Sequence, residues 1–188
     1  KELVDAGQLM QVETEYRVQT RESAAWEADF QKHRKALVDD DAKVSTARGE
    51  VLADAVRKRL GLTSAPHGAS KVPRKVGLYF GPVAPSPEPG VVPVWVRDAW
   101  AESESTVQTD AVKAGSDSPL VFVLLPNRNA DEIKKALVTL KGAETTLQTR
   151  GVPSNEEGNL ARAAVETRRD HAREQLATHL GEVIDAAQ

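Results

Sequence analysis

Six basic side chains lie between positions 57 and 75, and no acidic residue occurs among them. Clustered Lys and Arg side chains neutralise phosphates and release counterions, which is how proteins bind nucleic-acid backbones. The whole chain has a net charge of -3, so the segment predicts a local positive patch on an acidic protein. The alternative is a solvated helix end followed by a loop, since cations are favourable at a helix C-terminus. The candidate nucleic-acid-binding residues are Arg57, Lys58, Arg59, Lys71, Arg74 and Lys75.

A second set of polar residues follows two expected strands. Arg97 and Asp98 end one strand, and Asn127 and Arg128 follow another. Ligands bind α/β sheets outside the carboxyl ends of the strands, so these four side chains indicate an enzyme site as one alternative. The competing interpretation is structural, because Asn129, the next residue, suits the N-cap of a helix.

The sequence contains no contiguous catalytic motif. None of its 12 glycines fits a P-loop or a Rossmann fingerprint. No nucleophile elbow or zinc-protease helix motif occurs, and the absence of Cys excludes thiolate metal ligands and a Cys nucleophile. His171 and His179 are separated by about 12 Å of helix, too far to share a metal without another element. We therefore expect no catalytic, cofactor-binding or metal-ligating residue in this chain.

Two helices are expected before residue 62. Thr20 is a candidate N-cap for a helix over 21–38, in which Trp26 and Phe30 lie on one apolar face. The three aspartates at 39–41 interrupt this pattern, and a second helix then runs to a C-cap at Gly61. Its expected buried stripe is Val44, Ala47, Val51, Ala55 and Val56.

A small sheet is expected in the middle of the chain. Residues 61–75 are loop-like, and the four prolines within 82–90 predict an exposed excursion. The continuous apolar run 120–125 indicates a strand buried on both faces, as in the centre of a sheet. Three strands are expected, at 76–80, 91–96 and 120–125. A short helix is expected near 106–112.

Two C-terminal helices are expected to form an antiparallel hairpin. Asn129 with Glu132, and Ser154 with Glu157, fit capping boxes at the two starts. The second helix runs from Asn155 towards position 187, a length of about 45 Å. The buried stripes are Ile133, Leu137, Leu140, Ala143 and Leu147 in the first helix, and Val165, Ala172, Leu176, Leu180 and Val183 in the second.

The first twenty residues are typical of the end of a winged-helix domain. A helix tail carrying Leu3 and Val4 ends at Gly7, and strands at 9–12 and 16–19 then form a hairpin. The helices that should precede this hairpin are missing and the chain does not begin with Met, so we expect a segment of a longer protein.

The expected fold is mixed α/β, with a small three- to four-stranded sheet packed with helices. A winged-helix remnant and a helical linker precede the sheet, and a long helical hairpin follows it. The expected divisions are a winged-helix end at 1–20, a helical linker at 21–61, an α/β core at 74–150 and a long C-terminal helix at 154–188. No apolar run could cross a bilayer and no signal peptide is visible, so we expect no membrane partner and a cytoplasmic location.

Several blocks of the sequence resemble the middle region of one family of large P-loop ATPases from bacteriophage-exclusion (BREX) systems. This is the BrxC family, called PglY in phage-growth-limitation systems. The resemblance covers most of the 188 residues and rests on three blocks. They read GQLMQVETEYRVQTRESAAWEADF, VPVWVRDAW and LVFVLLPNRNADEIKKALVTLKGAETTLQTRGVPSNEEGNLARAAVETRR.

The resemblance implies a non-catalytic scaffold or interaction segment of a bacterial AAA+-like antiphage ATPase. The resemblance also implies that ATP and Mg bind in an N-terminal ATPase domain, before the winged helix. No Walker motif is present in this chain, so none of the family's nucleotide-binding positions carries over to it. The implied partners are other BREX or Pgl components, such as a DNA methyltransferase and a phosphatase-like protein. DNA is a further candidate partner through residues 57–75, and the long helix is a candidate for self-association.

Overall fold

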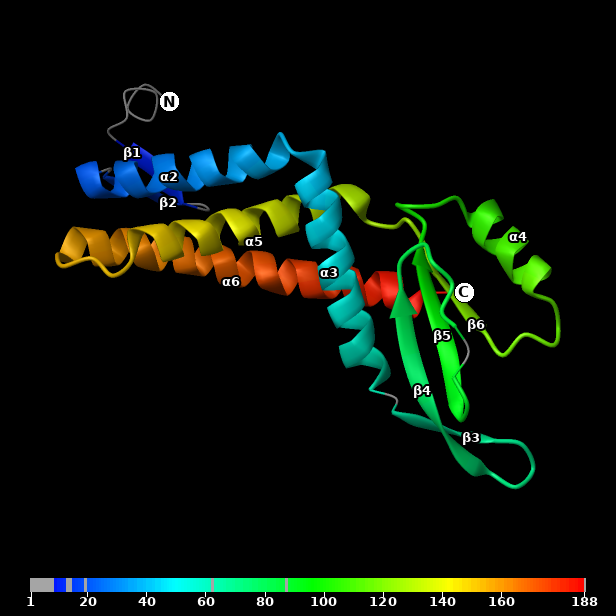
Figure 1. Ribbon diagram of the computed structural model, residues 1–188. Coiled ribbons are helices and arrows are strands. Elements are labelled where there is room, and N and C mark those ends of the chain that lie inside the picture. Colours follow the sequence, from blue (N-terminus) through cyan, green and yellow to red (C-terminus); the bar gives the residue numbers. More distant parts are fainter. Residues whose placement is uncertain (1–8, 13–14, 19, 62, 87, 188) are drawn as a thin grey trace. The chain divides into compact units, whose positions relative to one another are not determined.

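The computed structural model describes residues 9–12, 15–18, 20–61, 63–86 and 88–187 (Figure 1). The described chain divides into two compact units, each built from separate stretches of sequence. Unit 1 contains the residues up to Ala47 together with Lys134–Leu176, and unit 2 contains Arg48–Ile133 together with the residues from Ala177 onwards.

The N-terminal hairpin predicted from the sequence is present. Strand β1, Leu9–Val12, pairs antiparallel with β2, Glu15–Val18, and Leu9 lies opposite Val18. The second strand begins one residue earlier than predicted. The helix tail that would end at Gly7 lies outside the described residues, so the winged-helix assignment stays a prediction.

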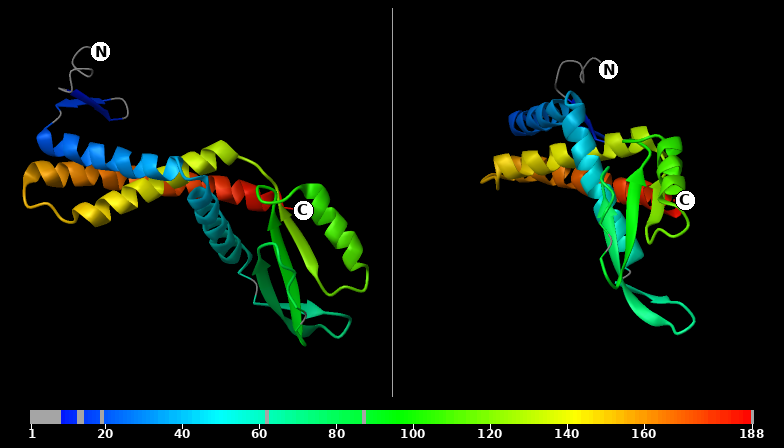
Figure 2. Two further views of the ribbon diagram at one scale, coloured as in Figure 1. Left: turned by 45° about the horizontal axis from the view of Figure 1, so that its top comes forward. Right: turned by 45° about the vertical axis from the view of Figure 1, so that its right-hand side comes forward.

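Three helices supply the core of unit 1. Helix α2, Arg21–Val38, packs Trp26 and Phe30 against α5, Ala130–Arg150, and α6, Glu156–Asp185. Both aromatic side chains are buried, and they meet small residues of the other two helices, Ala143, Ala161 and Val165. The views agree that α2 runs alongside α5 and α6 (Figure 2). The small residues let the helices approach closely, and the two aromatic side chains fill the space between them.

Helices α5 and α6 form the antiparallel hairpin that the sequence predicts. The chain reverses at Gly151, whose φ of 68° suits glycine, and Arg162 donates to the Gly151 carbonyl oxygen over 2.7 Å. Further along the pair, the Arg173 guanidinium lies 3.4 Å from the Glu144 carboxylate. The predicted apolar stripes are buried, apart from Leu147, which is partly buried.

Both predicted capping boxes are wrong. The side chain of Asn155, rather than that of Ser154, caps α6 by accepting from the Gly158 amide over 2.7 Å. Asn129 has a φ of 53°, outside the extended conformation of an N-cap, and its side-chain amide donates to Glu182.

Helix α3, Asp41–Leu60, begins in unit 1 and ends in unit 2. The Lys43 amide donates to the Asp40 side chain, and Gly61 follows the helix with a φ of 53°, as a C-cap should. Leu52, Ala53 and Val56 are its buried residues within unit 2. The predicted stripe is therefore partly wrong, because Val51 and Ala55 are only half-buried.

Unit 2 is built around a four-stranded mixed sheet in the order β3-β4-β5-β6. The strands are β3, Ser64–His67; β4, Val72–Phe80; β5, Val91–Asp98; and β6, Val121–Leu125. β4, β5 and β6 run parallel, whereas β3 is antiparallel to β4. Helix α4, Glu104–Ala114, connects β5 to β6 and is capped by Ser103.

The most buried strand is β5, not the apolar run 120–125. Pro93, Trp95, Val96 and Arg97 of β5 are buried, while β6 is the edge of the sheet and Val121 at its start is 44% exposed. The expectation of a central strand at 120–125 is therefore wrong. A continuous apolar run indicates that other elements, such as α4, cover the strand. It does not indicate where the strand lies within the sheet.

The segment 61–75, expected to be loop-like, instead contains β3 and the first half of β4. Its two prolines lie directly opposite each other, Pro66 against Pro73, in an antiparallel pair. The excursion at 82–90 agrees with expectation, since its described residues contain no strand or helix and are mostly exposed. Tyr79 donates to Glu88 over 3.4 Å and ties this excursion to β4; burial and then the Glu88 charge raise the pKa of the Tyr79 phenol.

The observed architecture is mixed α/β, as the sequence predicts. Among the described residues, none of the helices combines the length and the apolar composition that crossing a bilayer requires.

Candidate nucleic-acid interface

The six candidate cations divide into two groups. Arg57, Lys58 and Arg59 are exposed on the last turn of α3. The Arg57 guanidinium donates to Asp54 over 2.9 Å and lies 4.7 Å over the Phe80 ring, and Arg59 donates to Asp185 over 2.8 Å. Two of the three charges in this group are therefore already paired with carboxylates.

The second group lies on the hairpin formed by β3 and the first residues of β4, which we call the ribbon (residues 63–75). Lys71, Arg74 and Lys75 are exposed there. Within the part of the chain that the structure describes, none of these three forms an ion pair, and residues 63–75 contain no carboxylate. Their positive charge is available to an external anion.

Arg57 and Lys71 belong to opposite ends of β4. Arg57 lies over Phe80, the last residue of β4, whereas Lys71 immediately precedes its first residue. Nine residues of strand span about 30 Å. Arg57 and Lys71 therefore lie near opposite ends of β4, whereas Arg74 and Lys75 are the third and fourth of its nine residues.

The ribbon extends past the rest of the sheet. Lys75 opposite Val91 is the first pair between β4 and β5, so residues 72–74 pair only with β3. Both views show the hairpin reaching beyond the start of β5 (Figures 1 and 2). The turn runs from Gly68 to Lys71, closed by a Lys71 amide that donates to the Gly68 carbonyl oxygen over 3.2 Å.

The register places neighbouring cations on opposite faces of the ribbon. Arg74 lies opposite Ala65, and Lys75 lies opposite Ser64. Side chains that oppose each other share a face, and consecutive side chains of a strand alternate. Arg74 therefore shares its face with Ala65 and Val72, and Lys75 shares the other with Ser64 and Pro66.

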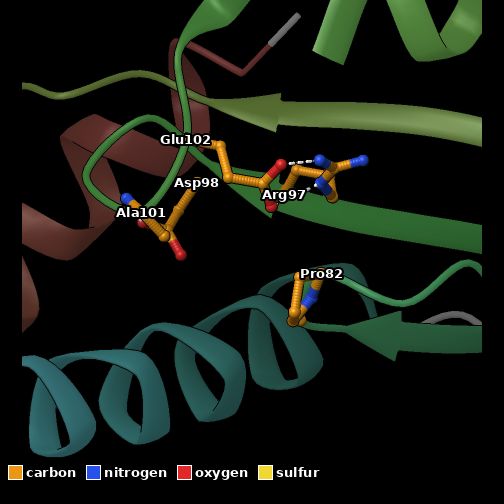
Figure 3. Close-up of a pocket in the computed structure, with 6 residues that line it drawn as sticks. Pro82, Arg97, Asp98, Ala101 and Glu102 are labelled. Atoms are coloured by element: carbon orange, nitrogen blue, oxygen red, sulfur yellow. Dashed lines mark hydrogen bonds and ion pairs between the residues drawn. The ribbon is translucent and has the colours of Figure 1, made fainter. Parts of the chain in front are cut away.

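The alternative enzyme site lies at the carboxyl ends of β4 and β5. A cavity of about 240 Å³ is lined there by Gly81, Pro82, Arg97, Asp98, Ala101 and Glu102 (Figure 3). Asn127 and Arg128, the other two predicted residues, do not line it and are exposed. The structure therefore brings only one half of the predicted set together.

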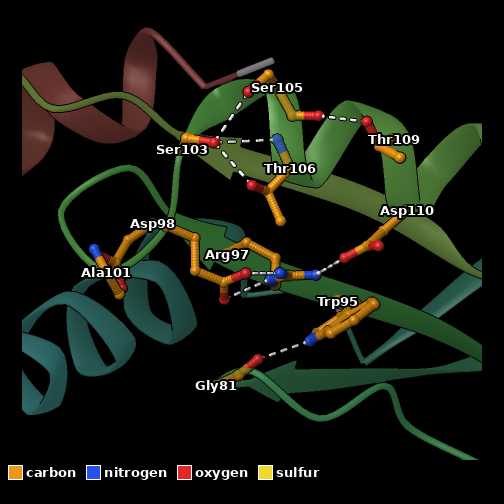
Figure 4. Close-up of polar contacts among 11 residues, drawn as sticks. Gly81, Trp95, Arg97, Asp98, Ala101, Ser103, Ser105, Thr106, Thr109 and Asp110 are labelled. Atoms are coloured by element: carbon orange, nitrogen blue, oxygen red, sulfur yellow. Dashed lines mark hydrogen bonds and ion pairs between the residues drawn. The ribbon is translucent and has the colours of Figure 1, made fainter.

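The polar groups around this cavity hold one another. Arg97 is 3% exposed; its Nε donates to Glu102 over 2.8 Å and its Nη1 to Asp110 over 3.1 Å (Figure 4). Its guanidinium also lies 4.2 Å from the centre of the Trp95 ring. Asp98 accepts from the amides of Trp100 and Ala101 over 3.1 and 3.0 Å. These contacts fix the turn after β5 and leave the Arg97 guanidinium neutralised.

The histidines of α6 and the acidic residues do not gather. His179 lies 3.4 Å from Glu182. Across the described ranges, no three His, Asp or Glu side chains come together as a metal site would require.

Sequence reasoning missed the ribbon and the two carboxylates on Arg97. The ribbon did have a signal, since two short segments flank a four-residue turn that begins with Gly68. The prolines concealed it, because they argue against a strand wherever their missing N–H would be needed. Glu102 and Asp110 had no comparable signal, since their pairing depends on how α4 folds back beside β5.

Comparison of the chain with family models, curated proteins and solved structures finds no match.

Proposed function

We propose that this chain is a non-catalytic interaction segment that contacts nucleic-acid phosphates through its ribbon. The observation that carries the proposal is the set of three exposed cations on residues 63–75, with no described carboxylate paired to them. Unpaired Lys and Arg side chains are the groups that phosphates attract most strongly. Such contacts position a protein on nucleic acid without reading its sequence.

The enzyme alternative has less support. The buried Arg97 is held by Glu102 and Asp110, and Asp98 accepts two backbone hydrogen bonds. Asn127 and Arg128 lie outside the cavity. These contacts favour a role for Arg97 and Asp98 in stabilising the fold of unit 2.

The resemblance to the BREX ATPases supplies the context of the proposal. The chain would be a part of a large AAA+-like antiphage ATPase in the bacterial cytoplasm, and ATP and Mg would bind elsewhere in that protein. The other BREX or Pgl components would be its protein partners, with the long helix α6 as a candidate surface for self-association. In this context the ribbon would bind the ATPase to nucleic-acid phosphates.

Fluorescence anisotropy with labelled double-stranded DNA tests the nucleic-acid contact. We expect binding at low salt that weakens as salt rises, since each phosphate contact changes the slope of log K against log salt by about 0.9. The Arg74→Ala, Lys75→Ala double variant should bind more weakly, with an unchanged melting temperature. Absence of binding at low salt, or binding that does not respond to salt, would reject the proposal.

In an ATPase that carries this chain, the same double variant should reduce phage restriction. Nucleotide hydrolysis measured without DNA should be retained, because the substitution would lie outside the nucleotide site. Full restriction by the double variant would argue against a role for the ribbon in defence.

A further inference from the structure

We infer that the ribbon enters the major groove of double-stranded DNA, with Arg74 facing the phosphates of one strand and Lys75 those of the other. This inference rests on the proposed function, and it specifies double-stranded DNA as the nucleic acid that the ribbon binds. Its basis is the register, which places the two neighbouring cations on opposite faces of one hairpin.

The thickness of the ribbon matches the major groove of B-form DNA better than the other nucleic-acid grooves. A strand layer with side chains on both faces is about 10 Å thick. The major groove of B-form DNA is about 12 Å wide, and the minor groove only about 6 Å. A ribbon turned with its faces towards the groove walls fits the major groove and brings one cation to each wall. The major groove of A-form RNA is deep and narrow, and it would exclude the ribbon.

The tip of the ribbon suits insertion. Gly68, Ala69 and Ser70 have the smallest side chains available, and Lys71 follows them with a φ of 50°. Apart from Lys71, the turn that would enter first therefore carries no bulky side chain. The ribbon also lacks Phe, Tyr and Trp, on which the bases of a single strand would stack. A duplex is the better match.

The prolines disfavour the competing partner, a protein strand added to the ribbon. The Val76 amide donates to the Thr63 carbonyl oxygen over 3.0 Å, and counting pairs from there places Pro66 and Pro73 in a non-hydrogen-bonded pair. Amides at such positions point outward, and proline has none. The outward amide of Lys75 is used by the Gly90 carbonyl oxygen. The free edge of β4 on the ribbon therefore offers no donor to a partner strand.

The test measures binding of the 188-residue chain to three labelled probes with equal numbers of phosphates: B-form duplex DNA, duplex RNA and single-stranded DNA. We expect the DNA duplex to bind roughly 10-fold more tightly than either of the others, since only it presents two phosphate walls at the right separation. Arg74→Ala and Lys75→Ala should each reduce the salt slope by about 1, and together by about 2.

Lys113→Ala is the matched control. It removes the same charge from an exposed position of unit 2 that is not on the ribbon. We expect it to leave the affinity and the salt slope unchanged. An equal loss in Lys113→Ala and Lys75→Ala would overturn the inference, since a diffuse basic surface would then be responsible.

The probes separate this inference from the proposed function. If all three bind equally and the ribbon variants weaken all three, the phosphate contact stands and the groove inference fails. If none binds, the proposed function fails with it. Binding of duplex DNA that loses affinity in only one of the two single variants would also reject insertion between two walls.

Discussion

The side chain of Thr146 is the hydrogen-bond acceptor for the ring of His33. Their Oγ1 and Nδ1 atoms are 2.9 Å apart, and Thr146 donates its own proton to the Gly142 carbonyl oxygen over 2.7 Å. A hydroxyl has one proton, so the Nδ1 atom of His33 must carry the proton of the shared bond. The fully buried Thr146 thereby fixes the tautomer of a half-buried histidine on the neighbouring helix.

Replacing Thr146 by Val should destabilise unit 1 through this bond. The change keeps the shape but leaves the His33 N–H without its acceptor, which costs about 1–2 kcal/mol. Chemical denaturation measures the loss. In a His33→Leu background the same change should cost much less, because the donor is already gone. Equal losses in the two backgrounds would show that the bond contributes nothing.

Replacing Arg97 by Met should destabilise unit 2 far more than the same change at Arg59. The side chains of Glu102 and Asp110 are only 20% and 33% exposed, so loss of Arg97 leaves two poorly solvated carboxylates, at a cost of about 3 kcal/mol. Arg59 and Asp185 are both well exposed, and such a pair contributes less than about 1 kcal/mol. Denaturant melts of the two variants would reveal the difference, and similar midpoints would contradict it.

Asn155 and Ser154 give a direct test of which residue caps α6. Asn155→Ala should cost about 1 kcal/mol, since the Gly158 amide loses its acceptor. Ser154→Ala, the change at the position that the sequence favoured, should cost little. Thermal melts of both variants would decide, and the reverse order would restore the predicted capping box.

Asp29 should make the stability of unit 1 depend on pH in the acid range. The hydrogen bond from Arg150, 2.6 Å long, lowers the pKa of Asp29 below its ordinary value of 3.8. The stabilisation is therefore fully present above pH 3.8 and is lost as the pH falls through the folded-state pKa. The melting temperatures of the native chain and of Asp29→Asn should converge as the pH falls through this range. A constant difference would contradict this account.

Leu124→Asp should unfold the sheet, even though β6 is an edge strand. Leu124 is 8% exposed, and an aspartate there would bury an unpaired charge. Circular dichroism and the melting temperature measure the outcome. A folded variant with an unchanged melting temperature would show that this side of β6 is accessible to water.

The helices were predictable because their signals are local. Trp26 and Phe30 recur at helical spacing after a capping Thr20, and the structure has the helix with the predicted ends. The packing partners of that helix were not predictable, because nothing in its own residues indicates that Ala161 and Val165 cover its aromatic side chains.

The sheet was predictable in composition but not in order. Three strands were visible as apolar runs, yet strand order is set by which crossovers fit, and an apolar run has the same appearance at an edge as in the centre. The candidate interface was half predictable. The charges of Arg74 and Lys75 are plain in the sequence, whereas their opposite faces follow only from the pairing of β4 with β3.

The divided make-up of unit 1 has a consequence for synthesis on the ribosome. Trp26 and Phe30 are made early, but the residues that cover them, Ala143, Ala161 and Val165, come after the whole of residues 48–133 has been made. Until α6 leaves the exit tunnel, the residues that bury these two aromatic side chains in the native structure are not available to the nascent chain. The growing chain should therefore depend on chaperones at this stage, when exposed apolar surface makes aggregation most severe.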